Sequence, residues 1–165
     1  MQIYLINNKS EEIKQISKIY IDSWRITYDG FVSDSYLKSL NYHDAEKKWT
    51  EFLSDTNNFI FVAKENNQVI GFVAGCIDDK NSEGELYALY VNPTLKNTGI
   101  GSKLLDKFFE YIKENHMTSV IVWAMSKNKK AISYYKHKGA VEYDYRMNNF
   151  SGEVVEDTAL IWREI

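Results

Sequence analysis

The sequence is poor in the residues that divide or cross-link a chain. Its 165 residues include one proline and one cysteine, Cys76. A single cysteine cannot form a disulfide within the chain. Cys76 lies in an apolar run without a surrounding motif, so we interpret it as a buried structural thiol rather than a nucleophile. No linker, repeat or low-complexity tract interrupts the sequence, which predicts one domain over residues 1–165.

Excess positive charge and long apolar segments are also missing. The net charge is −3, so the basic surface that nucleic-acid-binding proteins use is not expected. No apolar run approaches the ~20 residues that span a bilayer, and no charged-then-apolar leader opens the sequence. Hydrophobic residues make up 44% and aromatic residues 15% of the chain, which is typical of a globular protein. We expect a cytoplasmic protein that binds neither nucleic acid nor membrane.

The most informative stretch covers residues 85–114. Its aromatic-rich start, residues 85–91, predicts a strand, which ends at Pro93 because proline lacks the N–H that a central strand donates. A small-residue loop follows, and from Ser102 the apolar residues recur at helical spacing. The first turn of a helix has unpaired N–H groups, and glycines let a ligand approach the backbone. This arrangement is typical of a phosphate-binding site.

Two common phosphate-binding patterns do not fit the loop. The P-loop requires Gly-Lys-Ser/Thr, whereas Gly101 is followed by Ser102 and Lys103. The dinucleotide-binding pattern requires a third glycine where Leu104 stands. From two glycines alone, a strand–turn–helix corner that binds nothing remains equally open.

A second pattern follows the strand predicted for residues 118–124. It reads Asn128-x-x-Ala131-x-x-Tyr134-Tyr135-x-x-x-Gly139. Asn128 can cap a helix, and Gly139 can end it in the left-handed conformation. These structural roles hold beside any function that the residues have.

The N-terminal part predicts one strand, residues 2–6, and three helices rich in aromatic residues. We expect Ser10 to cap the first helix, which runs to about Trp24, and a turn at Asp29-Gly30. Predicted starts of the next two helices are Ser33 or Asp34, and Asp44. Trp24 and Tyr28 lie beside the glycine turn, where core packing and an acceptor pocket are both open interpretations.

The remaining segments predict a mixed sheet. Strands are expected at residues 58–65, 68–77, 85–91, 118–124, 141–148 and 154–163. Their order with the helices indicates an α+β domain with a mostly antiparallel sheet. The helix between the strands at 85 and 118 allows these two to be parallel.

Four carboxylates lie within eight residues: Asp78, Asp79, Glu83 and Glu85. Without histidine or calcium-loop spacing they predict no metal site. A solvated hairpin loop is the simpler interpretation. The functional alternative is that they attract a cationic amine.

The two motifs together resemble the GCN5-related N-acetyltransferase (GNAT) superfamily. Its pyrophosphate loop reads Arg/Gln-x-x-Gly-x-Gly/Ala, here Lys96-x-x-Gly99-x-Gly101, and its second motif ends in Gly-Phe, where this chain has Ala140. The likeness covers about residues 58–165, and residues 23–30 more loosely match a segment that some members carry. It implies the acetyltransferase fold, with a mixed, mostly antiparallel central sheet, splayed parallel strands and flanking helices.

The resemblance also implies an acetyl-CoA-dependent, metal-free N-acetyltransferase that works by direct attack in a ternary complex. Its pantetheine-pairing strand corresponds to Leu89, Tyr90 and Val91, and its pyrophosphate loop to Lys96, Asn97, Thr98, Gly99, Ile100, Gly101 and Ser102. Asn128 and Tyr135 are also expected at the cofactor. Tyr135 matches the tyrosine that protonates the leaving sulfur. Glu85 matches the position of a general base in several members, or is an ordinary strand-end carboxylate.

The acceptor is the least defined part of this hypothesis. We expect a small cationic, polyamine-like primary amine that contacts Trp24, Tyr28 and Glu85 and enters between the N-terminal helices and the acidic loop. The alternatives are a module that binds acetyl-CoA without turnover and a peptide or protein N-acetyltransferase. Either a monomer or a homodimer is compatible with the sequence.

Overall fold

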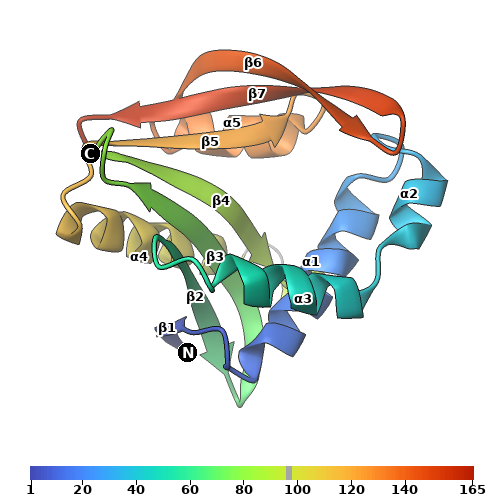
Figure 1. The fold of residues 1–165 in the computed structure, drawn as a ribbon, viewed down its shortest axis with the longest axis horizontal. Coiled ribbons are helices and arrows are strands. Elements are labelled where there is room, and N and C mark those ends of the chain that lie inside the picture. Colours follow the sequence, from blue (N-terminus) through green and yellow to red (C-terminus); the bar gives the residue numbers. More distant parts are fainter. Residues whose placement is uncertain (96–97) are drawn as a thin grey trace.

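A computed structural model describes residues 1–95 and 98–165 (Figure 1). The strands are β1 (Gln2–Ile6), β2 (Asn58–Glu65), β3 (Gln68–Asp78), β4 (Glu83–Val91), β5 (Ser119–Met125), β6 (Val141–Phe150) and β7 (Glu153–Arg163). The helices are α1 (Glu12–Thr27), α2 (Asp34–Ser39), α3 (Tyr42–Phe52), the 3-10 helix η1 (Pro93–Leu95), α4 (Ile100–Glu114) and α5 (Lys129–His137). None of the described helices is long and apolar enough to cross a membrane.

The seven strands form one sheet in the order β1-β2-β3-β4-β5-β7-β6. Every neighbouring pair is antiparallel except β4 and β5, which are parallel because α4 crosses over between them. This confirms the mixed, mostly antiparallel sheet that the sequence predicts.

Helices cover both faces of the sheet and create two cores. On one face, α4 and α5 pack onto the sheet and bury Leu104, Phe108 and Ile112 completely. On the other face, α1 and α3 pack onto the sheet and bury Ile16 and Trp49 completely. The amphipathic pattern of each helix therefore decides which face it covers.

Several local signals act where the sequence places them. Ser33 caps α2 by accepting a hydrogen bond from the Tyr36 N–H, and the Asn128 side chain caps α5. The pair Asn66 and Asn67 has φ angles of 48° and 65° and joins β2 to β3 in a hairpin.

Other boundaries differ from the prediction. The Ser10 hydroxyl accepts a hydrogen bond from the Asn7 N–H, and α1 begins at Glu12 without a side-chain cap. α3 begins two residues before Asp44, because Asn41 accepts the hydrogen bond of the Asp44 N–H. β4 begins at Glu83, which pairs with Asp78, so the predicted acidic loop is shorter and partly strand.

Candidate active site

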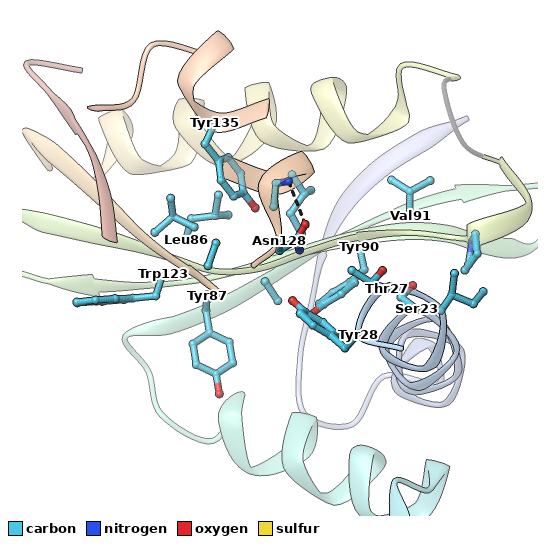
Figure 2. A pocket seen from close by; sticks show the side chains of 17 residues that line it. Ser23, Thr27, Tyr28, Leu86, Tyr87, Tyr90, Val91, Trp123, Asn128 and Tyr135 are labelled. Carbon is cyan, nitrogen blue, oxygen red and sulfur yellow. Dashed lines mark hydrogen bonds between the residues drawn. The ribbon is translucent and has the colours of Figure 1, made fainter. Parts of the chain in front are cut away.

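The two parallel strands diverge in the middle of the sheet. β4 pairs with β5 only from Glu83, opposite Ser119, to Leu86, opposite Val122. Beyond Leu86, β4 continues along β3, while β5 continues along β7. The gap between them opens into a cavity of about 230 Å³ (Figure 2).

A β-bulge marks the point of divergence. Ala88 pairs with Ala74 and Leu86 pairs with Gly75, so Tyr87 between them has no partner in β3. The extra residue reverses the face of the sheet to which the following side chains point. Leu86 packs in the core between the sheet and α4, whereas Ala88, two residues later, packs in the core between the sheet and α1. Because a bulge bends its strand and increases its twist, the one at Tyr87 turns β4 away from β5.

The cavity brings together predicted residues from two distant segments. Leu89, Tyr90 and Val91 of β4 line it together with Asn128 and Tyr135, which α5 supplies. Along its cavity side, β4 has no neighbouring strand after Leu86 in the described part of the chain. Its backbone polar groups there can pair with an extended ligand, as those of an edge strand can.

Tyr135 is held so that its hydroxyl reaches this cavity. The Asn128 side-chain oxygen accepts a hydrogen bond from the Ala131 N–H at 3.2 Å, which fixes the start of α5. The Tyr135 ring packs edge-on against Trp162, and its hydroxyl points toward Tyr28 of α1 (Figure 2). Burial, reinforced by Tyr28, raises the pKa of Tyr135 well above its ordinary value. The phenol therefore keeps its proton and can donate it.

The glycine loop before α4 forms a second part of the site. Two predicted residues, Lys96 and Asn97, lie outside the described residues. Gly99 has a φ of +76° and is the N-cap of α4, without a side-chain hydrogen bond. Among the residues that the structure describes, a Cβ at Gly99 would meet no atom within 4 Å, and the nearest atom to one at Gly101 would belong to Val91, at 3.6 Å.

This part of the fold suits an anion. The N–H groups of the first turn have no partner inside the helix and carry the positive end of its dipole. The backbone angle explains glycine at position 99. Neither a positive φ nor crowding explains Gly101, so close approach of a ligand to the backbone is the remaining reason. The described residues at the N-terminus of α4 thus leave its N–H groups open to an anionic ligand.

A second cavity, of about 220 Å³, lies on the other side of the opening. Six residues line both cavities: Tyr28, Tyr87, Ala88, Tyr90, Trp123 and Ala124. The two cavities therefore adjoin at the gap between β4 and β5. Trp24 contributes to the wall of the second cavity although it is only 9% exposed, so it has a place in both the core and the pocket.

Comparison with known proteins supports the interpretation of this geometry. Residues 14–140 match the Acetyltransferase (GNAT) family. The chain belongs to this family. It is 33% identical to the uncharacterized N-acetyltransferase YuaI of Bacillus subtilis over 163 residues, which cover 95% of this chain and 91% of YuaI. The protein is therefore an enzyme, an N-acetyltransferase of the GNAT type.

Two further similarities concern proteins from Thermoplasma acidophilum. A spermidine N(1)-acetyltransferase is 24% identical over 144 residues, covering 84% of this chain and 88% of that protein. The PaiA N-acetyltransferase, solved in complex with coenzyme A, superimposes with a TM-score of 0.80 at 20% identity and covers 99% of both chains. This structure confirms the GNAT fold.

In this acetyltransferase Glu85 lies beside the opening rather than in the wall of either cavity. It stands two residues before the bulge and opposite Cys76, whose sulfur is 3.9 Å from a Glu85 carboxylate oxygen. Burial raises the pKa of Glu85, and the charge of Arg146 partly opposes the shift. Burial and the Glu85 charge raise the pKa of the Cys76 thiol to about 12, which fits a structural thiol.

The acidic residues of the β3–β4 hairpin are separate from the aromatic pocket. Asp78 and Glu83 pair where β4 begins, and none of Asp78, Asp79 and Glu83 lines either cavity. Trp24 of α1 instead packs against Tyr20 and against Tyr36 of α2, and these two helices lie toward the other end of β4 (Figure 1). The structure therefore does not bring the acidic loop and the N-terminal aromatic residues to one entrance.

Several residues that line the cavities are not among the site residues predicted from the sequence. Ser23 and Thr27 of α1 line the first cavity, and Lys48, Arg146 and Asp157 line the second. Arg146 and Asp157 meet only because the register of the β6–β7 hairpin pairs them. Lys48 precedes the buried Trp49 on a helix, where a lysine normally faces solvent.

Proposed function

We propose that the protein transfers the acetyl group of acetyl-CoA directly to the primary amine of a small molecule in a ternary complex. The observation that carries this proposal is that the two cavities adjoin, with six lining residues in common, at the point where β4 leaves β5. A donor in the first cavity and an amine in the second would meet at this opening. Direct attack then needs no acyl-enzyme, and the sole cysteine, Cys76, lines neither cavity.

The first cavity and the glycine loop fit the donor. The pantetheine arm would extend along Leu89, Tyr90 and Val91, on the cavity side of β4, where the described residues place no neighbouring strand. The pyrophosphate would bind at the N-terminus of α4, which Gly101 leaves open. The coenzyme A complex of the similar PaiA structure supports this assignment.

The chemistry follows from the groups around the opening. The neutral amine attacks the thioester carbonyl, and a backbone N–H of β4 near Leu89 or Tyr90 would stabilise the tetrahedral oxyanion. As the new C–N bond forms, the amine loses a proton, which Glu85 would accept through water. The C–S bond then breaks, and the thiolate takes the proton of Tyr135. Burial makes Glu85 a stronger base by raising its pKa, and it keeps the Tyr135 phenol protonated until the thiolate leaves.

A polyamine is a second candidate for the acceptor. The similarity to a spermidine N(1)-acetyltransferase favours it. Aromatic faces such as those of Trp24 and Tyr28 also attract ammonium groups. The charged side chains of the second cavity argue for a different acceptor.

A thiol-release assay over a panel of amines tests the proposed function. We expect amine-dependent release of coenzyme A, with one acetylated product per thiol. Binding of acetyl-CoA without amine-dependent release would instead indicate a module that holds the coenzyme without turnover. Release with peptide N-termini but no small amine would indicate a peptide or protein N-acetyltransferase.

A further inference from the structure

The second cavity contains a lysine, Lys48, for which the described part of the chain supplies no counter-ion. Lys48 of α3 donates a hydrogen bond to the Tyr20 hydroxyl at 2.9 Å. Its Nζ lies 4.5, 5.1 and 5.4 Å from the ring centroids of Tyr20, Trp49 and Tyr87. Within residues 1–95 and 98–165, Lys48 forms no ion pair. Three aromatic faces therefore hold the ammonium, and no carboxylate balances its charge.

The opposite wall does not supply the missing negative charge. Arg146 lies over the ring of Trp123, 4.1 Å from its centroid, and its Nε is 3.2 Å from a carboxylate oxygen of Asp157. Asp157 also accepts a hydrogen bond from Asn148. Among the described residues the lining thus has two cations and one carboxylate, and that carboxylate is already paired.

None of the titratable groups described around Lys48 supplies a negative charge that would balance its ammonium. Tyr20 of α1, Tyr36 of α2 and Tyr87 of β4 keep their protons, because burial raises their pKa values. Asp44, one turn earlier on α3, lines another hollow together with Lys48, but its carboxylate accepts a hydrogen bond from Asn41 and forms no ion pair with Lys48 among the described residues. Arg146 and Asp157 face it across the cavity as a pair.

We propose that the acceptor carries a carboxylate besides its reacting amine, and that Lys48 binds this carboxylate in the second cavity. The inference rests on the proposed function and names its substrate class. A desolvated ammonium without a counter-ion is unfavourable, and an anionic substrate group removes that cost. The second ammonium of a polyamine would meet a like charge at the same place. The aromatic walls favour an acceptor with an apolar or aromatic body between amine and carboxylate.

The behaviour of Lys48 itself agrees with this role. Burial lowers the pKa of Lys48 to about 8, so the free enzyme holds the cation at a cost that a bound carboxylate would offset. If Lys48 only packed against the aromatic rings, it would not contribute to the binding of an anionic substrate. Binding of the carboxylate should therefore raise the pKa of Lys48.

Three amines of one shape test the proposal. These are para-(aminomethyl)benzoate, para-(aminomethyl)benzamide and para-xylylenediamine, which share the aminomethyl group and differ in the charge at the other end. We expect kcat/KM to be roughly tenfold or more higher for the benzoate than for the benzamide, and lowest for the diamine. Lys48→Gln should remove the preference, Lys48→Arg should retain most of it, and Lys47→Gln on the exposed side of α3 should leave it unchanged.

The contrary outcomes are equally definite. Equal kcat/KM for the benzoate and benzamide, a preference for the diamine, or a preference that survives Lys48→Gln would overturn the proposal. If no amine releases coenzyme A, the proposed function fails instead. Calorimetry of para-(aminomethyl)benzoate with the acetyl-CoA-bound protein then decides on the pocket: binding that Lys48→Gln abolishes supports it, and no binding overturns it.

Discussion

Leu86 is the last residue of β4 that pairs with β5, and its partner there is Val122. One residue later the bulge at Tyr87 turns β4 away, and both cavities reach the gap that results. The proposed donor and acceptor sites are thus two sides of one irregularity in strand pairing.

Gly101→Asp should weaken the binding of acetyl-CoA by roughly tenfold or more, because it places a side chain and a negative charge at the N-terminus of α4. The surrounding protein leaves space for a Cβ there, so the fold should be retained. Calorimetry measures the affinity, and thermal unfolding serves as the control. Unchanged affinity in the folded variant would remove the loop from the donor site.

Tyr135→Phe should lower kcat by about 100-fold while the affinity for acetyl-CoA stays nearly constant, because the change removes the proton donor and keeps the ring. Tyr134→Phe is the matched control. The Tyr134 hydroxyl has no hydrogen-bond partner in the described part of the chain, and its ring packs against the α4 core. Equal kcat values for the two variants would contradict the role of Tyr135.

Glu85→Gln should remove the Glu85 ionisation from the acidic limb of the pH profile of kcat/KM, leaving that of the substrate amine, and should lower the plateau by about 100-fold. Because burial raises the pKa of Glu85, the base is protonated and inactive at low pH and becomes active as the pH rises through that value. Glu83→Gln, at the start of the same strand, should leave the profile unchanged. A normal profile for Glu85→Gln would identify this residue as an ordinary strand carboxylate.

The preference for the benzoate over the benzamide should decline as the pH rises through about 8, the pKa of Lys48 in the free enzyme. Lys48 is a cation below that pH and loses its charge above it, so the benzoate alone is affected. Taking the ratio of the two kcat/KM values cancels the ionisation of the amine that both substrates share. A ratio that stays constant with pH would show that Lys48 does not contact the carboxylate.

The triple variant Asp78→Asn/Asp79→Asn/Glu83→Gln should leave KM unchanged for every amine, including diamines, at low and high salt. These side chains line neither cavity, and Asp78 satisfies its carboxylate locally by accepting hydrogen bonds from Lys80 and Asn81. A KM for diamines that rises more at low than at high salt would restore the acidic loop to the acceptor site.

Local signals made part of the site predictable from the sequence. Gly99 and Asn128 each act on a helix end within a few residues, so motif and structure coincide. The parallel pairing of β4 and β5 also follows from the sequence, because an intervening helix requires a crossover.

Other parts of the site depend on pairing between distant segments. The bulge at Tyr87 becomes visible only when the register of β3 against β4 is known. Arg146 faces Asp157 only through the β6–β7 register. Lys48 enters the pocket because α3 packs beside α1 and brings it to Tyr20. The acidic loop misled the prediction for the opposite reason, since a cluster of charges in the sequence says nothing about which end of the sheet it occupies.

Initial-rate kinetics with acetyl-CoA and the amine varied together test direct transfer through the opening between β4 and β5. If both substrates occupy the two cavities at once, the double-reciprocal lines intersect. Parallel lines would mean that coenzyme A leaves before the amine binds, which would require an acetylated enzyme and contradict the ternary complex.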